Sequence, residues 1–374
     1  IIHVLNELEK QMTYSIVNSA KKEYFLVLAF FAAIVGYFLE HTLIGMGQVV
    51  SLVTSVTLIG FIILCSLRVA HHAEVLAEKV GEPYGTMILT TSAVLVEVII
   101  LAIMMMNNDS PTLARDTIYA AVMLDMNGIM GIAALIGGLK YGSQPYNDDS
   151  SKSYIAMILT AIGVSMIVPE FIHVDKWKFY SVFSIIMMVM LYALFLKMQT
   201  GQHSYFFSYT YADKGENHHA ENAGSTKESL SILVVGIIMI GFLAEIMSKT
   251  LEVGIKDTGI PLIFSALVVA AISASPEIMT AIRAAMANRM QPVVNIALGA
   301  SLSTVILTVP IIELIALIKN QPIEMALTPV QTVMVFITLV VAAINLNDGK
   351  TNAIEGMTHF VLFGTFIMLT FLGY

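Results

Sequence analysis

The amino-acid sequence predicts an all-α polytopic membrane protein with about eleven transmembrane helices, and three observations lead to this fold class. Of the 374 residues, 57% are hydrophobic and only 12% are charged, whereas a soluble domain carries about 25% charged residues. The charges lie between apolar runs of roughly twenty residues, the length that crosses about 30 Å of hydrocarbon. The alternating segments of about ten residues that are typical of a transmembrane β-barrel are missing.

The predicted elements follow one another along the chain. Residues 1–22 are amphipathic and fit either a helix on the membrane surface or a frayed tail, and because the sequence begins at Ile1 rather than Met we expect the natural N-terminus to lie upstream. Eleven apolar segments follow, and we expect each to cross the membrane once as a helix. They lie at 23–40, 48–69, 85–106, 112–138, 153–172, 178–199, 229–248, 261–287, 293–318, 328–346 and 356–373.

A long polar stretch at residues 200–228 divides the chain, and its acidic and histidine-rich composition predicts a solvated cytoplasmic linker. We expect an N-terminal surface segment and first helix at 1–47, a five-helix repeat at 48–199 and a second five-helix repeat at 229–374. Because five is odd, the second repeat would cross the membrane in the opposite sense to the first. The sequence therefore predicts two inverted repeats, an arrangement common among secondary transporters.

The placement of basic residues predicts the orientation in the membrane. If the segments alternate, thirteen of the nineteen Lys and Arg residues lie on the side of the N-terminus and six on the other side. Basic residues are enriched on the cytoplasmic side of membrane proteins. We therefore expect a cytoplasmic N-terminus and an external C-terminus.

Two glutamates near the centres of apolar segments are the leading functional candidates. Glu97 and Glu277 occupy corresponding segments of the two repeats, and a charge in hydrocarbon costs several kcal/mol, about 2.5 or more on insertion scales. Pro276 removes a backbone donor and is expected to expose carbonyls near Ile272 and Ser273, which suit a cation. The alternative is that each glutamate only joins neighbouring helices by hydrogen bonds.

Other polar residues at mid-depth are candidates for the same site. Asp125 and Asn127 lie two residues apart in one segment, so they point in nearly opposite directions on a helix, and Asn127 is the preferred candidate. Ser303 supplies a hydroxyl from the second repeat, although hydroxyls often only join helices. Glu74 and Glu245 lie near helix ends, where they serve either as gating or access residues for the cation or simply as solvated carboxylates.

Several classes of protein are excluded or disfavoured. The single cysteine, Cys65, lies in an apolar run and rules out a disulfide framework or a CxxC metal site. No GxxxxGK[ST] motif is present, so transport would not be driven by ATP. None of the nine histidines is expected at mid-depth, which argues against a membrane-embedded hydrolase. The expected partners are inorganic cations, protons and the lipid bilayer rather than nucleic acid, with the oligomeric state left open.

Two segments carry a resemblance to a known family, PEIMTAIRAAMANRMQPVVNIALGASLSTVILTVP and GEPYGTMILTTSAVLVEVIILAIMMMNNDSPTLARD. Over residues 25–374 the chain resembles the cation/calcium exchanger superfamily, in particular its bacterial calcium/proton (sodium/calcium–proton) antiporter branch. The motif of that superfamily is Gly-Asn, two residues, then Glu. Glu97 and Glu277 match the glutamate, whereas Ala93-Val94 and Ser273-Ala274 stand in place of the two Gly-Asn pairs.

The resemblance implies that Glu97 and Glu277 bind the cation and exchange protons, assisted by Asn127 and by Ser303 or Thr304. We therefore predict a multi-pass antiporter of the bacterial inner membrane that exchanges Ca²⁺ and/or Na⁺ or K⁺ for H⁺ by alternating access, without a cofactor or enzymatic activity. The two missing amides predict that monovalent cations are accepted. A sodium/calcium exchanger without proton coupling and a passive cation channel are the alternatives, and the inverted repeat argues against the channel.

Overall fold

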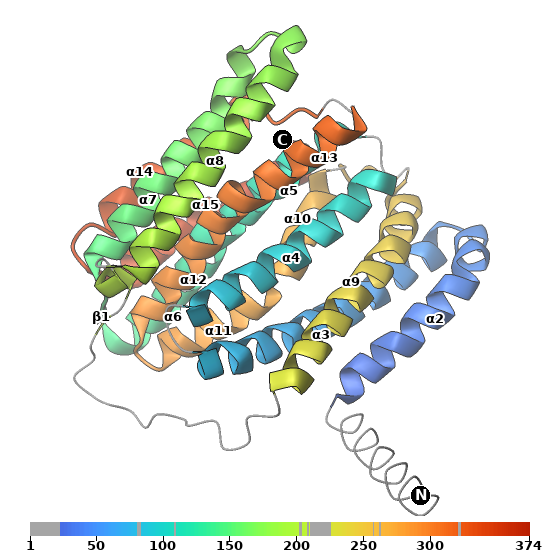
Figure 1. Cartoon of the computed structure of the whole chain (residues 1–374), viewed down its shortest axis with the longest axis horizontal. Coiled ribbons are helices and arrows are strands. Elements are labelled where there is room, and N and C mark those ends of the chain that lie inside the picture. The colour runs from blue at the N-terminus through green and yellow to red at the C-terminus, as the bar shows by residue number, and fades with distance from the viewer. Residues whose placement is uncertain are drawn as a thin grey trace, which may run out of the picture.

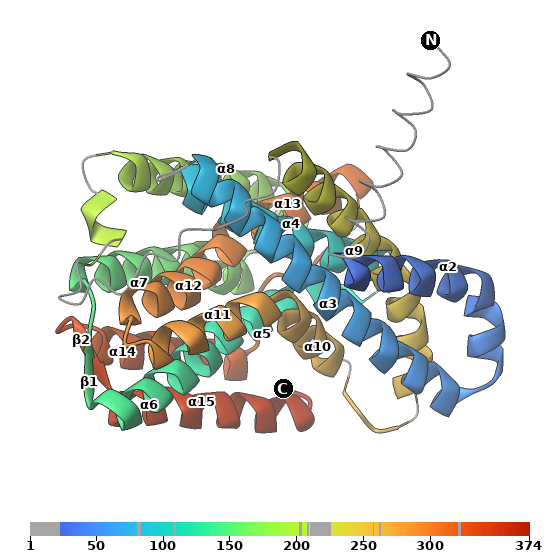
Figure 2. The same cartoon turned by 90° about the horizontal axis from the view of Figure 1, so that it is seen from below.

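The computed structural model describes residues 23–80, 84–107, 110–201, 204–207, 209, 226–256, 258–261, 263–320 and 323–374. The expected surface segment at 1–22 and most of the linker at 200–228 lie outside these residues. The described part is a bundle of long helices with one two-stranded sheet at its edge (Figures 1 and 2).

Fourteen α-helices are described, and three π-helical segments interrupt or extend them. The helices are α2 (Tyr24–Gly45), α3 (Gln48–Val80), α4 (Tyr84–Asn107), α5 (Leu113–Met123), α6 (Met130–Tyr141), α7 (Asp148–Ile162), α8 (Trp177–Thr200), α9 (Thr226–Ile255), α10 (Ile263–Ser273), α11 (Ser275–Met286), α12 (Met290–Ser303), α13 (Val309–Lys319), α14 (Pro329–Asn345) and α15 (Ala353–Phe371). The π-helical segments are η1 (Leu124–Ile129), η2 (Gly163–Ile167) and η6 (Thr304–Thr308). Strands β1 (Ser143–Pro145) and β2 (Lys350–Asn352) pair antiparallel.

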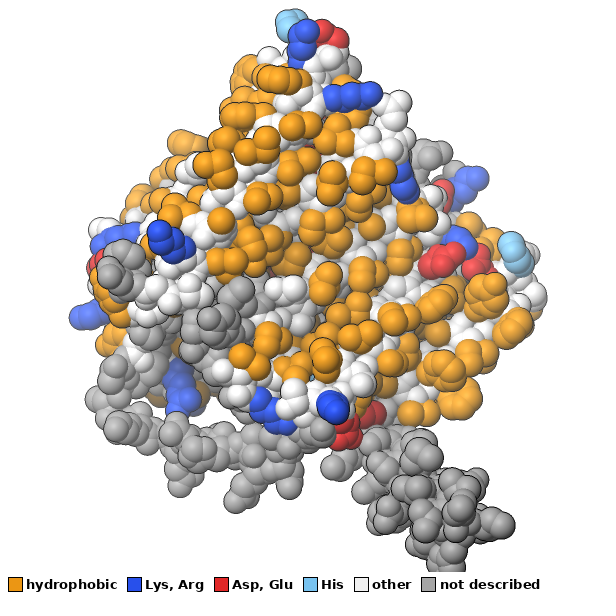
Figure 3. All heavy atoms as spheres, viewed as in Figure 1, with side chains coloured by type: hydrophobic (Ala, Val, Ile, Leu, Met, Phe, Trp, Pro, Cys, Tyr) orange, Lys and Arg blue, Asp and Glu red, His pale blue; other side chains and the backbone are white. Residues whose placement is uncertain are grey.

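The described helices confirm an all-α polytopic membrane protein. Nine continuous helical spans are long and apolar enough to cross a membrane, and α10 and α11 form a further span that is bent by 55°. Helix α14 is apolar but shorter. Figure 3 shows hydrophobic side chains over most of one face and charged side chains toward its margins. The count of eleven crossings and the inverted arrangement stay predictions.

Several loops come together at one end of the bundle. They are the loops that lie on one side of the membrane if successive segments cross it in opposite directions. Strand β1 precedes α7 and strand β2 precedes α15, and the two strands pair. The Asn147 side-chain amide donates to the Tyr205 carbonyl at 2.9 Å, and the Gln144 amide donates to the Ala285 carbonyl at 3.0 Å. We call this side the linker face; its described residues include 142–147, 201, 204–207, 287–289 and 346–352.

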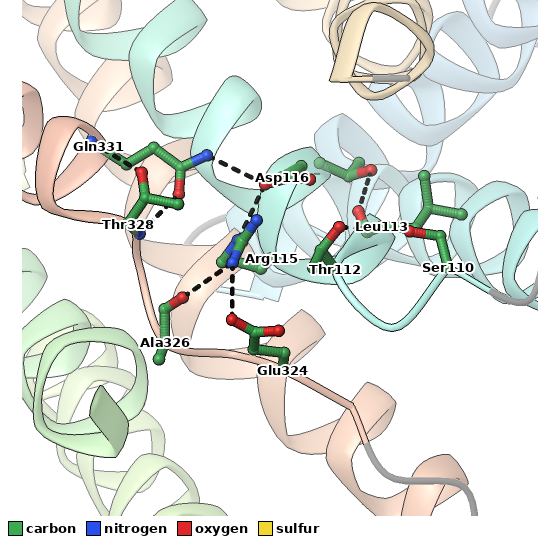
Figure 4. Close-up of polar contacts among 10 residues, drawn as sticks. Ser110, Thr112, Leu113, Arg115, Asp116, Glu324, Ala326, Thr328 and Gln331 are labelled. Carbon is green, nitrogen blue, oxygen red and sulfur yellow. Dashed lines mark hydrogen bonds and ion pairs between the residues drawn. The ribbon is translucent and has the colours of Figure 1, made fainter. Parts of the chain in front are cut away.

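The opposite face is joined by a separate polar network (Figure 4). Arg115, at the start of α5, donates to Asp116 at 2.9 Å, to Glu324 at 3.3 Å and to the Ala326 carbonyl at 3.2 Å. Asp116 also accepts a hydrogen bond from Gln331 at 3.0 Å. These bonds fasten the segment before α14 to the start of α5. They also give the buried guanidinium partners for its donors.

Two spans form the centre of the bundle, and both contain a π-helical segment. In their most apolar windows, Leu113–Tyr141 is 83% buried and Met290–Lys319 is 67% buried, whereas Tyr24–Gly45 at the edge is only 17% buried. A π-helical turn is rare and often marks a functional site. In the middle of these two spans the polar residues Asp125, Asn127, Ser301 and Thr304 are buried.

Candidate functional site

A cavity of about 820 Å³ lies between the two central spans and helices α3, α4, α10 and α11. Residues from both halves of the chain line it, including Glu97, Asp125 and Glu277. Its lining extends to the exposed residues Glu74 and Tyr205, so it approaches the linker face.

Glu97 lies on α4 and is buried, with 5% of its surface exposed. One of its carboxylate oxygens accepts hydrogen bonds from Thr304 at 2.9 Å and from Thr308 at 3.3 Å, both in η6. Its other oxygen, Oε1, has no hydrogen-bond partner among the described residues. Hydroxyl donors thus stabilise charge on one oxygen, and the second can accept a further hydrogen bond or a cation.

Glu277 lies in the first turn of α11, directly after the break in the broken span. The break is centred on Ala274, and Pro276 follows in the first turn of α11, where its missing backbone donor costs little. The start of a helix carries a partial positive charge, which favours a carboxylate there. Oε2 of Glu277 is buried and has no hydrogen-bond partner in the described part of the chain.

The carbonyls near the break are only partly available as ligands. The expectation was that Pro276 leaves the carbonyls of Ile272 and Ser273 without their helical donors. The Ile272 carbonyl instead accepts a hydrogen bond from the Ser275 hydroxyl at 2.8 Å. The Ser273 hydroxyl donates to the Ala270 carbonyl at 3.0 Å, and Ser273 itself lines the cavity. A carbonyl oxygen retains a second lone pair after accepting one bond.

Asp125 and Asn127 point to different sides of η1. Asp125 lines the cavity, whereas Asn127, the candidate preferred from the sequence, does not. Asp125 lines the cavity, is 3% exposed and accepts a hydrogen bond from Ser301 at 3.4 Å. It interacts electrostatically with Glu277 and Glu97. Asn127 is absent from the cavity lining, because its amide bonds to Thr338 and His359 behind η1.

The remaining predicted site residues divide between the cavity and its surroundings. Ser303 lines the cavity, although its hydroxyl donates to the Gly299 carbonyl at 2.7 Å. Glu74 lies at the exposed margin of the cavity. Glu245 is not part of the lining, because it lies in an ion pair with Lys249, which also pairs with Glu40 of α2 at 3.1 Å. Glu245 therefore pairs within α9, and Lys249 joins this helix to α2 away from the cavity lining.

Sequence reasoning missed Thr308, and it did not expect a histidine inside the bundle. Thr304 and Thr308 are spaced four residues apart in span Met290–Lys319, a pattern that could have suggested one polar face. His359 is 1% exposed and bonded to Asn127, so a histidine does lie inside the bundle.

The cavity offers oxygen atoms of several kinds rather than a cluster of acidic ligands alone. Among the described residues, no group of three or more His, Cys, Asp or Glu side chains is arranged to hold a metal ion. A cation there would meet carboxylate, hydroxyl and carbonyl oxygens together, which are the ligands that hard cations such as Ca²⁺ prefer.

Comparison with known proteins assigns the family. The sodium/calcium exchanger protein family matches residues 50–201 and 228–372. The sodium-potassium/proton antiporter ChaA of Escherichia coli (strain K12) is 29% identical over 335 residues, covering 87% of this chain and 92% of the relative. The Ca²⁺/H⁺ antiporter of Aphanothece halophytica is 23% identical over 314 residues, covering 79% and 83%.

Solved structures agree on the fold. The structure of native YfkE superposes with a TM-score of 0.73 at 20% identity and covers 92% of this chain and 99% of that one. The H⁺/Ca²⁺ exchanger CAX superposes with a TM-score of 0.64 at 16% identity, covering 93% and 88%. With a family match over most of its length, the chain belongs to the sodium/calcium exchanger protein family.

Proposed function

We propose that the protein is a secondary antiporter that exchanges Ca²⁺, Na⁺ or K⁺ for H⁺ at the acidic cavity. The observation that carries the proposal is that Glu97, Asp125 and Glu277 line one cavity within a helical bundle that crosses the membrane. Carboxylates in such a position are costly and usually mark an ion or proton pathway. The names of the relatives, a sodium-potassium/proton and a Ca²⁺/H⁺ antiporter, support this class.

Coupling follows from the chemistry of the carboxylates. Oε1 of Glu97 and Oε2 of Glu277 have no hydrogen-bond partner among the described residues. Each can accept a proton or a cation, but a bound cation repels a proton from the same pair of groups. The cavity would therefore hold either the cation or the protons, and the two would cross the membrane in opposite directions.

Alternating access requires part of the bundle to move. The cavity approaches the linker face, whereas on the opposite face the network around Arg115 ties the segment before α14 to α5. Helices α3 and α9, at corresponding positions of the proposed repeats 48–199 and 229–374, pack along each other. We infer that these two helices slide or tilt against the central spans to open one face at a time.

The choice of cation depends on the number of oxygen ligands. Ca²⁺ takes six to eight oxygens, and two amides of the family motif are missing because Ala93-Val94 and Ser273-Ala274 stand in their place. The cavity also lacks the amide of Asn127. A site with fewer fixed ligands accepts Na⁺ or K⁺ as well, while its carboxylates still balance the charge of Ca²⁺.

The experiment that tests the proposal is proton flux in everted membrane vesicles with an acidified interior. We expect protons to leave the interior when Ca²⁺, Na⁺ or K⁺ is added, and not when choline is added. Cation uptake without any proton movement would favour the sodium/calcium exchanger without proton coupling. A flux that follows the membrane potential alone and needs no counter-ion would indicate a channel.

A further inference from the structure

A buried hydrogen-bonded chain lies behind η1, on the side away from the cavity. The Asn127 amide nitrogen donates to the Thr338 hydroxyl of α14 at 2.8 Å. The Asn127 amide oxygen lies 3.0 Å from Nδ1 of His359 on α15. Asn127 and Thr338 are fully buried and His359 is 1% exposed. Segment η1 thus meets two consecutive helices that lie more than 200 residues later in the sequence.

The bonding pattern determines which nitrogen of His359 carries the proton. The Asn127 amide nitrogen donates to the Thr338 hydroxyl. That hydroxyl donates to the Met123 sulfur at 3.7 Å. The amide oxygen is therefore the atom that faces His359, and Nδ1 must donate to it. Nδ1 is thus the protonated nitrogen that faces Asn127, and Nε2 has no hydrogen-bond partner among the described residues.

Glycines allow α15 to come close enough for this contact. A methyl group added at Gly131 of α6 would lie 2.8 Å from the Phe360 nitrogen, and one at Gly356 of α15 would lie 2.3 Å from the Leu135 nitrogen. Both separations are too short for a side chain. Small residues at such contacts let membrane helices pack backbone to backbone. The position of His359 is therefore set by the packing of α6 against α15.

We propose that His359 is a positioning residue, which acts through Asn127 to hold η1 so that Asp125 faces the cavity. The inference rests on the proposed function, because Asp125 is taken as part of the cation site. Asp125 and Asn127 lie on nearly opposite sides of the same π-helical segment. Fastening Asn127 from behind therefore fixes the rotation of the segment and the direction of the Asp125 carboxylate.

A pair of substitutions separates this role from a proton-carrying one. The amide nitrogen of asparagine can replace Nδ1 of histidine, whereas the longer glutamine places its amide near Nε2. His359→Asn keeps the donor to Asn127 but removes the titratable ring, and His359→Gln keeps a polar side chain but loses the donor. Thr338→Val releases the other end of the same amide and is the second, independent variant.

The first measurement is cation-driven proton release in proteoliposomes with Ca²⁺ and with Na⁺. We expect His359→Gln and Thr338→Val to raise the KM for the cation about five-fold, the scale of one buried hydrogen bond, with little change in kcat. His359→Asn should keep the wild-type KM. An unchanged KM in His359→Gln and Thr338→Val overturns the proposal, and so does a loss in His359→Asn as large as that in His359→Gln, because the ring itself would then act.

The second measurement does not depend on transport. Asp125→Cys, in a Cys65→Ser background, is labelled from the linker face with a membrane-impermeant thiol reagent. We expect His359→Gln to slow this labelling and His359→Asn to leave it unchanged. Equal labelling in both overturns the positioning role. The expected labelling difference, together with no cation/proton exchange by the protein that keeps Asp125, would leave the positioning role standing and would contradict the proposed function instead.

Discussion

Two carboxylates of the candidate site each have one oxygen without a hydrogen-bond partner among the described residues, and their other contacts differ. Glu97 is held by Thr304 and Thr308, whereas Glu277 takes its position from the first turn of α11. Neighbouring side chains thus hold Glu97 in place, whereas the start of a helix holds Glu277. Substitutions of the two threonines therefore test how the protein holds Glu97 without removing the carboxylate itself.

Thr304→Val should weaken cation binding because it removes the shorter of the two hydrogen bonds to Glu97, at 2.9 Å. A hydrogen bond to a charged group contributes about 1.5–3 kcal/mol, so we expect the KM for the cation to rise by roughly ten-fold or more. Cation titration of proton release in vesicles measures this value. Thr304→Ser keeps the hydroxyl and serves as the control; an equal rise of KM in both variants would contradict the account.

Residue identity alone was enough to select some of the site residues but not others. Glu97 and Glu277 stand out because acidic residues are rare inside apolar segments. The spacing of Asp125 and Asn127 predicts that they point apart, but it does not show which of them faces the cavity. Glu245 was grouped with Glu74 from a similar local sequence, yet its pairing with Lys249 four residues later is a pattern the sequence does contain.

At the scale of elements, the contact between α6 and α15 depends on the absence of side chains. A methyl group at Gly138 of α6 would lie 2.2 Å from the Ala353 nitrogen, and the approach at Gly356 is similarly short. Such backbone contacts cannot be read from hydropathy, because glycine occurs in loops and helices alike. The π-helical segments η1 and η6 are likewise invisible in the periodicity of the sequence.

Gly356→Ala should destabilise the protein because the new methyl group forces α15 away from α6. Overpacking of this kind costs about 1–3 kcal/mol, so we expect a lower midpoint of thermal unfolding in detergent. Gly364→Ala on the same helix is the matched control, because nothing lies within 4 Å of its position. A midpoint that is equal in the two variants would show that the backbone contact is not limiting.

At the scale of the whole molecule, the sequence predicted the fold class and the segments that form most of the helices. Long apolar runs are the strongest signal in a membrane protein, because the bilayer requires every spanning backbone to satisfy its own hydrogen bonds. The meeting of distant loops, such as β1 with β2 or Arg115 with Glu324, could not be predicted from one sequence. The inverted arrangement remains a prediction that topology mapping can test.

Cysteine labelling tests the arrangement of the faces. In a Cys65→Ser background, we expect Asp149→Cys on the linker face to react only from the cytoplasm and Tyr374→Cys only from the outside. Both native side chains are exposed, so reagents can reach these positions. Labelling of both positions from the same side would mean an even number of crossings between them, which the proposed odd five-helix repeat does not allow.

The central claim, that the cavity glutamates exchange a cation for protons, is tested most directly by Glu277→Gln and Glu97→Gln in everted vesicles. The amide keeps the shape of each side chain but cannot release a proton, so each variant should lose Ca²⁺- and Na⁺-driven proton release while its amount in the membrane and its thermal stability stay at the wild-type level. Full proton release by either variant at normal protein levels would contradict the account.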